Sequence, residues 1–115
     1  MRNTQLLETI LSLERASEET GRAIWGALAE ELNRPKRRRV SVNLSRIDRH
    51  TEEGDVVAVP GKVLASGGLS KAVRVAAYSF SEGAREKIRE ARGEAMSLTD
   101  LLDRGVEPSQ IKIIK

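Results

Sequence analysis

The first third of the chain shows apolar residues at helical spacing. In residues 4–17, one side of the expected helix collects apolar side chains: Leu6, Leu7, Ile10, Leu11 and Leu13. In residues 22–33 the same spacing returns, and the apolar set is Ile24, Trp25, Leu28, Ala29 and Leu32. Pro35 ends the second helix, because proline has no amide hydrogen with which to continue it. The pattern predicts an antiparallel hairpin of two helices, with Trp25 in the core.

The remainder of the chain alternates between extended and helical patterns. Extended segments are predicted over residues 40–44, 55–59, 73–77, 94–97 and 111–114. Helical spacing is found over residues 44–50, 81–92 and 97–105. Ser81 and Ser97 precede two of these helices as N-caps, with Asp100 three residues after Ser97. The predicted fold class is therefore α/β: an N-terminal α-helical hairpin followed by a small, irregular, mostly parallel β/α core.

Length and composition fit one small domain. With 115 residues, of which 39% are hydrophobic, the chain can build one modest core, so residues 1–115 are expected to form a single domain. Within it we expect the hairpin over 1–33, a basic segment over 34–50 and the α/β core over 51–115. The absence of cysteine excludes disulfides and thiolate chemistry and favours the cytoplasm. The longest uncharged run, Val63–Ser70, is eight residues, so no membrane partner is expected.

Positive charge is concentrated in the basic segment, residues 34–50. The whole chain carries +3, whereas this segment alone carries +6, residues 1–33 carry −3, and residues 51–115 are neutral. Six of its seven basic residues are arginines, whose planar guanidinium suits bidentate contacts with phosphate. Such a charge density repels itself unless a polyanion neutralises it, which favours nucleic acid as the partner. A solvated loop is the alternative interpretation.

A second candidate site is the run PGKVLASGGLSK, residues 60–71. Pro60 and Gly61 predict a turn, and Gly67 and Gly68 leave the backbone free to approach a phosphate closely. The neighbouring side chains that could bind an anion are Lys62, Ser66, Ser70 and Lys71. The spacing matches neither a P-loop nor the dinucleotide-binding fingerprint, so nucleotide hydrolysis is not predicted.

Several motifs together resemble a known family. They are Val59-Pro60-Gly61-Lys62-Val63-Leu64, the Ser66-Gly67 turn with Leu69 and Lys71, Val75-Ala76-Ala77, and Phe80-Ser81 followed by Ala84 and Ile88. Upstream and downstream the match continues through Trp25, Arg34-Pro35, Val42-Asn43-Leu44, Arg46-Ile47 and residues 111–115. Essentially the whole chain thus resembles archaeal members of the L-eighteen-e family of large-ribosomal-subunit proteins, which shares a domain with bacterial ribosomal protein L-fifteen. The resemblance implies large-subunit ribosomal RNA and neighbouring ribosomal proteins as partners, and no catalytic residues.

Charge and geometry supply the residue assignments. We predict that RNA phosphates contact Arg34, Lys36, Arg37, Arg38 and Arg39. The contact is expected to continue, on one positive face, through Asn43, Arg46, Arg49 and His50. A second contact is predicted at Lys62, Ser66, Gly67, Gly68 and Lys71, with Arg74 at its margin. The three aromatic residues offer no platform for stacking unpaired bases, so folded RNA is the expected substrate class.

Two other functions remain open at this point. A DNA-binding or regulatory module could use the two N-terminal helices as a helix-turn-helix, although Glu30 and Glu31 would repel phosphate. A small phosphate-binding enzyme could use residues 60–71, although this segment has no nucleophile or metal cluster beside it, and Asp55 and His50 are the only nearby candidates for a general base. With one histidine and no cysteine, the chain can assemble neither a two-histidine nor a cysteine-based metal site. We expect no cofactor, no metal and no small-molecule substrate.

Overall fold

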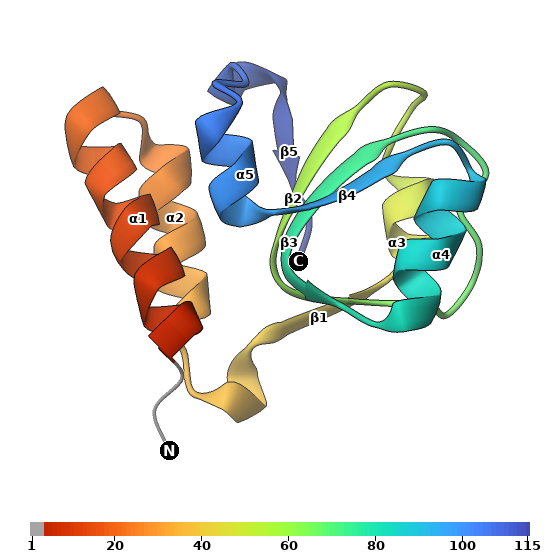
Figure 1. Cartoon of the computed structure of the whole chain (residues 1–115), viewed down its shortest axis with the longest axis horizontal. Helices are drawn as coiled ribbons and strands as arrows, with labels where there is room; N and C mark the ends of the chain where they lie inside the picture. Colours follow the sequence, from red (N-terminus) through yellow and green to blue (C-terminus); the bar gives the residue numbers. More distant parts are fainter. Residues whose placement is uncertain (1–3) are drawn as a thin grey trace.

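A five-stranded parallel sheet organises residues 4–115, the part of the chain described by the computed structural model (Figure 1). The strands are β1 (Val40–Asn43), β2 (Val56–Leu64), β3 (Arg74–Phe80), β4 (Glu94–Ser97) and β5 (Ile111–Ile113). The helices are α1 (Thr4–Thr20), α2 (Ala23–Leu32), α3 (Leu44–Arg49), α4 (Glu82–Glu90) and α5 (Leu98–Asp103). Two 3-10 turns, η1 (Lys36–Arg38) and η2 (Pro108–Gln110), precede β1 and β5. The predicted α/β class with an N-terminal helical hairpin is confirmed.

Strand β2 is the centre of the sheet. On one edge it pairs with β3 over most of its length. On the other edge its first residues, 56–58, pair with β5, and its last residues, 61–64, pair with β1. All of these pairings are parallel. Strands β1 and β5 therefore lie end to end along the same edge of β2.

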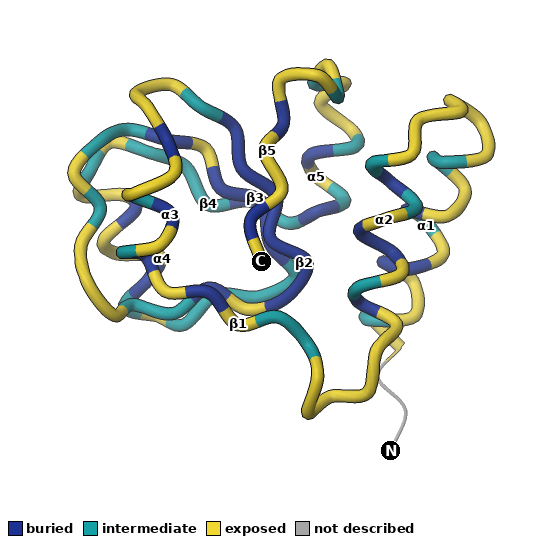
Figure 2. Tube along the Cα trace, turned by 180° about the vertical axis from the view of Figure 1, so that it is seen from behind, coloured by how far each residue is buried: buried dark blue, intermediate teal, exposed yellow. Residues whose placement is uncertain are grey.

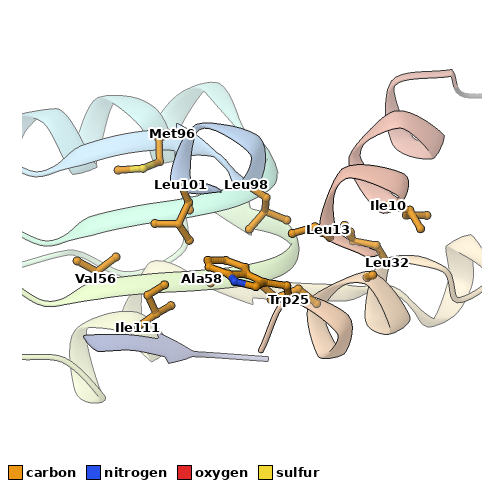
Figure 3. Close-up of a cluster of buried hydrophobic side chains, with 13 residues drawn as sticks. Ile10, Leu13, Trp25, Leu32, Val56, Ala58, Met96, Leu98, Leu101 and Ile111 are labelled. Carbon is orange, nitrogen blue, oxygen red and sulfur yellow. The ribbon is translucent and has the colours of Figure 1, made fainter. Parts of the chain in front are cut away.

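Successive residues of β2 point into two separate cores. Val56 and Ala58 pack with the helices α1, α2 and α5 on one face of the sheet, in a cluster that includes Trp25, which is only 4% exposed (Figure 3). Val57 and Val59 pack on the other face, in the cluster formed with α3 and α4. Figure 1 shows these two groups of helices on opposite sides of the sheet. Burial on both faces is typical of parallel sheets, and it explains the uninterrupted apolar run at this strand.

The predicted turn at Pro60 and Gly61 is wrong, because both residues lie inside β2. Pairing with β3 shifts between Val59 and Lys62, so that two residues of β2 oppose one of β3. Such a bulge tolerates proline because the ladder there does not need its missing amide hydrogen. Glycine is required next to it: a Cβ atom at Gly61 would lie 2.0 Å from the carbonyl oxygen of Val40 in β1.

Both predicted N-caps are confirmed. The hydroxyl of Ser81 accepts a hydrogen bond from the amide of Ala84 at 3.2 Å. The hydroxyl of Ser97 accepts one from the amide of Asp100 at 3.0 Å, and the Asp100 carboxylate accepts one from the Ser97 amide. Each cap satisfies amide groups that the first turn of a helix leaves without partners. Among the helices of residues 4–115, none has the length and apolar character needed to cross a membrane.

The predicted buried face of α1 is partly wrong. Thr9 and Leu13 are buried, as is Ile10, but Leu7 and Leu11 are 52% and 48% exposed. At about 3.6 residues per turn, Leu11 lies two residues from both Thr9 and Leu13 and therefore points nearly opposite to them. Helix α1 packs on the rest of the fold with one face only. Its apolar residues extend around more of the helix than this face, so some of them remain exposed.

Burial decides the effect of truncating leucines in the hairpin. We expect Leu28→Ala to lower the free energy of unfolding by about 2–5 kcal/mol, because Leu28 is fully buried and its removal leaves a cavity. Leu11→Ala is the matched control, and it should change that free energy by less than about 0.5 kcal/mol. Urea unfolding of the two variants measures both effects. Equal losses would mean that the hairpin packs through a different face.

Candidate nucleic-acid interface

The first part of the basic segment, residues 34–50, forms an exposed connection between α2 and β1. Most of the arginines of the segment lie in this connection. Pro35 is extended, and the η1 turn that follows buries none of its residues (Figure 2). Arg34 pairs with Glu31 of α2 at 3.2 Å, and its carbonyl oxygen accepts a hydrogen bond from Nε of Arg39 at 3.3 Å. These contacts hold the connection against the end of α2 and leave Arg37 and Arg38 exposed to solvent.

Lys36 and Arg39 line a surface hollow of about 360 Å³, which we call the cationic hollow. Its complete lining is Lys36, Arg39, Val40, Ser41, Gly61, Lys62, Tyr78 and Ser79. Lys62 was predicted to belong to the second contact, with residues 66–71, but it lies here beside the arginine segment. Three cations from η1, from the residue before β1, and from β2 therefore meet at one concave surface.

Strand register places polar side chains across the floor of the cationic hollow. Ser41 of β1 is the register partner of Lys62 in β2, and Lys62 is in turn the partner of Ser79 in β3. Neighbouring partners in a parallel sheet present their side chains on the same face. The two serines were not identified from the sequence, because only the register of strands that are distant in the chain brings them to Lys62.

The second half of the basic segment lies on the other face of the sheet. Leu44 and Ile47 bury one side of α3, which leaves Arg46, Arg49 and His50 exposed. Asn43 is exposed at the N-cap of α3, and its side chain makes no capping hydrogen bond. Because α3 packs opposite the hairpin (Figure 1), the positive charge forms two surfaces on either side of β1 and not the single face that we predicted.

The glycine-rich loop is bound to the helices beside it. The amide of Ser45 in α3 donates to the carbonyl of Ser66 at 3.2 Å, and Nζ of Lys87 in α4 donates to the carbonyls of Ala65 and Gly67 at 2.8 Å. Ser66, Gly67 and Gly68 stay exposed. Lys87 was not identified from the sequence as part of this site, because it follows the loop by some twenty residues. The loop is thus separate from Lys62 and carries its own cation.

Lys71, the last residue of the predicted second contact, serves the fold itself. Its side chain is 26% exposed, and Nζ donates to the carbonyls of Asp48 and Thr51 at 2.8 and 2.7 Å. The Asp48 carboxylate accepts from both the amide and the hydroxyl of Ser70, each at 2.9 Å. These two hydrogen bonds, with the nearby Lys71, hold the pKa of Asp48 below its ordinary value. Asp48, the one acidic residue of the basic segment, therefore anchors the end of the loop.

Most of the predicted phosphate-binding cations form no salt bridge with an acidic residue in the described part of the chain. Within residues 4–115, salt bridges involve Arg34 and Lys71 from the predicted set. The cations of the set without a salt bridge there are Lys36, Arg37, Arg38, Arg39, Arg46, Arg49 and Lys62. Among residues 4–115 no carboxylate forms a salt bridge with these cations, so their charge is available to an external anion. No group of three His, Cys, Asp or Glu that could hold a metal ion occurs among the described residues.

Lys71 and Lys62 should differ in their contributions to stability. We expect Lys71→Met to lower the free energy of unfolding by about 1–3 kcal/mol, because two carbonyls lose a charged donor. Lys62→Met removes an exposed cation without a salt bridge in the described chain and should change it by less than about 0.5 kcal/mol. Denaturant unfolding at neutral pH compares the two variants. A stable Lys71→Met protein would show that the network around Asp48 is not structural.

The anchor formed by Asp48 should depend on pH. The ordinary pKa of this carboxyl is 3.8 and folding lowers it, so its contribution to stability is complete above that value and is lost as pH falls through the lower folded-state pKa. We expect wild type to exceed Asp48→Asn in unfolding free energy by a constant amount above about pH 5, and by progressively less below about pH 4. Thermal unfolding of both proteins across this range measures the difference. A difference that stays constant at acidic pH would contradict the assignment.

Comparison with known proteins gives a consistent result. The model of a family described as ribosomal proteins 50S-L15, 50S-L18e and 60S-L27A matches residues 41–96. A relative from Methanothermobacter thermautotrophicus, named large ribosomal subunit protein eL18, is 44% identical over 98% of this chain and 93% of its own length. A protein of the same name from Haloarcula marismortui is 43% identical over 98% of this chain and 97% of its own. The chain therefore belongs to the eL18 family of large ribosomal subunit proteins.

Proposed function

We propose that this protein is a structural constituent of the large ribosomal subunit that binds folded ribosomal RNA. The observation that carries the proposal is the group of seven cations around β1 that form no salt bridge within residues 4–115. Phosphate groups supply the compensating charge that the described part of the fold lacks. The relatives at 39–44% identity are named as proteins of the large subunit, which supports the same assembly for this chain.

The cationic hollow and the exposed arginines of η1 are suited to a phosphate backbone, and the aromatic residues present no fully exposed ring to unpaired bases. Trp25 is buried, and Tyr78 and Phe80 are half-buried. The guanidinium of Arg85 lies 4.9 Å from the centre of the Phe80 ring and covers one of its faces. Within the described chain no ring is therefore fully open for stacking, so recognition would proceed through shape and phosphate contacts.

The structure gives no support to a helix-turn-helix function. Trp25, Leu28 and Leu32 of the second helix are buried against the sheet, and the outward-facing Glu30 would repel a DNA backbone.

The alternative of a phosphate-binding enzyme is not supported either. The Asp55 carboxylate pairs with Lys112 at 2.8 Å and accepts a hydrogen bond from the amide of Glu52, which makes it an unsuitable general base. The partners we propose are large-subunit ribosomal RNA and neighbouring ribosomal proteins.

The arginines of the exposed connection provide the test. Replacing Arg37, Arg38 and Arg39 with Ala should weaken binding to structured ribosomal RNA fragments. It should also reduce the slope of log affinity against log salt by up to about one unit per lost phosphate contact. Binding is measured across a salt series for structured RNA and for duplex DNA of equal length. We expect wild type to prefer one folded RNA.

A matched variant separates local from general charge effects. Arg15→Ala, Arg22→Ala and Arg89→Ala together remove three exposed arginines outside the proposed interface and the same total charge. This triple variant should keep the wild-type slope to within about half a unit, since it breaks no phosphate contact. If both triple variants behave alike, or if RNA and DNA bind equally weakly, the basic segment is a nonspecific cationic loop and the proposal fails.

A further inference from the structure

The outward side of α1 carries an apolar and acidic stripe that the function proposed above does not use. Leu7 and Leu11 are one turn apart, and Glu14 and Glu18 continue the same line along the helix. All four residues are exposed, and the two leucines are two of the three large hydrophobic residues exposed in residues 4–115. We call Leu7, Leu11, Glu14 and Glu18 the outer α1 stripe.

Within the described chain nothing covers this stripe. Helix α1 packs on α2 and α5 through its opposite side, where Thr9, Ile10 and Leu13 are buried. Figure 1 shows α1 as the outermost helix of its layer. The stripe therefore lies on the outside of the molecule, where another macromolecule can reach it.

Helix α4 shows what a simple solvated helix surface looks like in the same molecule. Its exposed residues mix Glu82, Glu86 and Glu90 with basic side chains, and its apolar residues Ala84 and Ile88 are buried. By contrast, α1 carries four glutamates against one arginine and exposes two leucines. The exposed surface of α1 thus differs from that of α4 in two ways: it carries exposed leucines and an excess of negative charge. Charge keeps a helix surface soluble, but solubility does not require exposed leucines.

The charge of α1 decides which occupant fits. RNA is repelled by a helix with an excess of carboxylates. A second copy of this chain would bring two such helices together, with like charges facing each other. A cationic protein segment with apolar side chains matches both parts of the stripe, since it can cover the leucines and pair with Glu14 and Glu18.

We propose that the outer α1 stripe is a docking surface for a cationic segment of another protein that also carries apolar side chains. The stripe lies on a different element from the basic segment and the cationic hollow, so the proposal stands independently of RNA binding. Through it the molecule would contact RNA with one region and a basic protein with another.

The test uses the full chain and two synthetic peptides. One is an amphipathic peptide of leucines and lysines at helical spacing, and the other replaces each lysine with glutamate. We expect the lysine peptide to bind and to shift the amide resonances of residues 7–18, and we expect the glutamate peptide not to bind. Leu7→Ser with Leu11→Ser, and separately Glu14→Gln with Glu18→Gln, should each weaken the lysine peptide about tenfold.

The matched control is Glu86→Gln with Glu90→Gln, which removes the same charge from α4 and should leave peptide affinity unchanged. The leucine variants should also bind structured ribosomal RNA like wild type, so a failed RNA proposal would be recognised separately. Equal effects of the α1 and α4 variants would reduce the stripe to a nonspecific acidic surface. Shifts of residues 7–18 by RNA, or a dimer that the leucine variants abolish, would replace the proposed occupant with RNA or a second copy.

Discussion

The parallel pairing of β2 is the constraint on which the rest of the structure depends. Its backbone groups are withdrawn from water, so they must be satisfied by β3 on one edge and by β1 and β5 on the other. Its side chains alternate between the two cores and so position the hairpin on one face and α3 with α4 on the other. The same pairing positions Lys62, near the end of β2, in the lining of the cationic hollow.

Local signals in the sequence were sufficient for the elements. Helical spacing, the two serine caps and the short apolar strands each depend on neighbours a few residues away, and the structure confirms them. Leu7 and Leu11 could not be placed correctly, because their exposure depends on how much of α1 the fold covers. Pro60 and Gly61 resemble a turn in any local analysis, and only the approach of Val40 from another strand shows that they are extended.

The sequence predicted which residues supply positive charge to the candidate site, but it did not predict which of them lie together in the fold. The run of arginines in residues 34–39 is visible in the sequence itself, and the structure leaves Arg34, Arg37 and Arg38 exposed and Arg39 half-buried. Nothing in the local sequence distinguishes Lys62 from Lys71. Strand register places Lys62 in the cationic hollow, whereas Lys71 donates hydrogen bonds to the carbonyls of Asp48 and Thr51. Distinguishing an available cation from one used by the fold requires the long-range contacts themselves.

The position of β1 has a consequence for the protein before it reaches any partner. This strand is one edge of the sheet, with β4 at the opposite edge, and an uncovered edge is a template on which other copies can add strands and aggregate. Here the edge is only four residues long, and cations precede and follow it in the chain. A second copy that approached in register would bring its own arginines against these. The same charges that we assign to RNA thus oppose the addition of a further strand at β1 in the newly made chain.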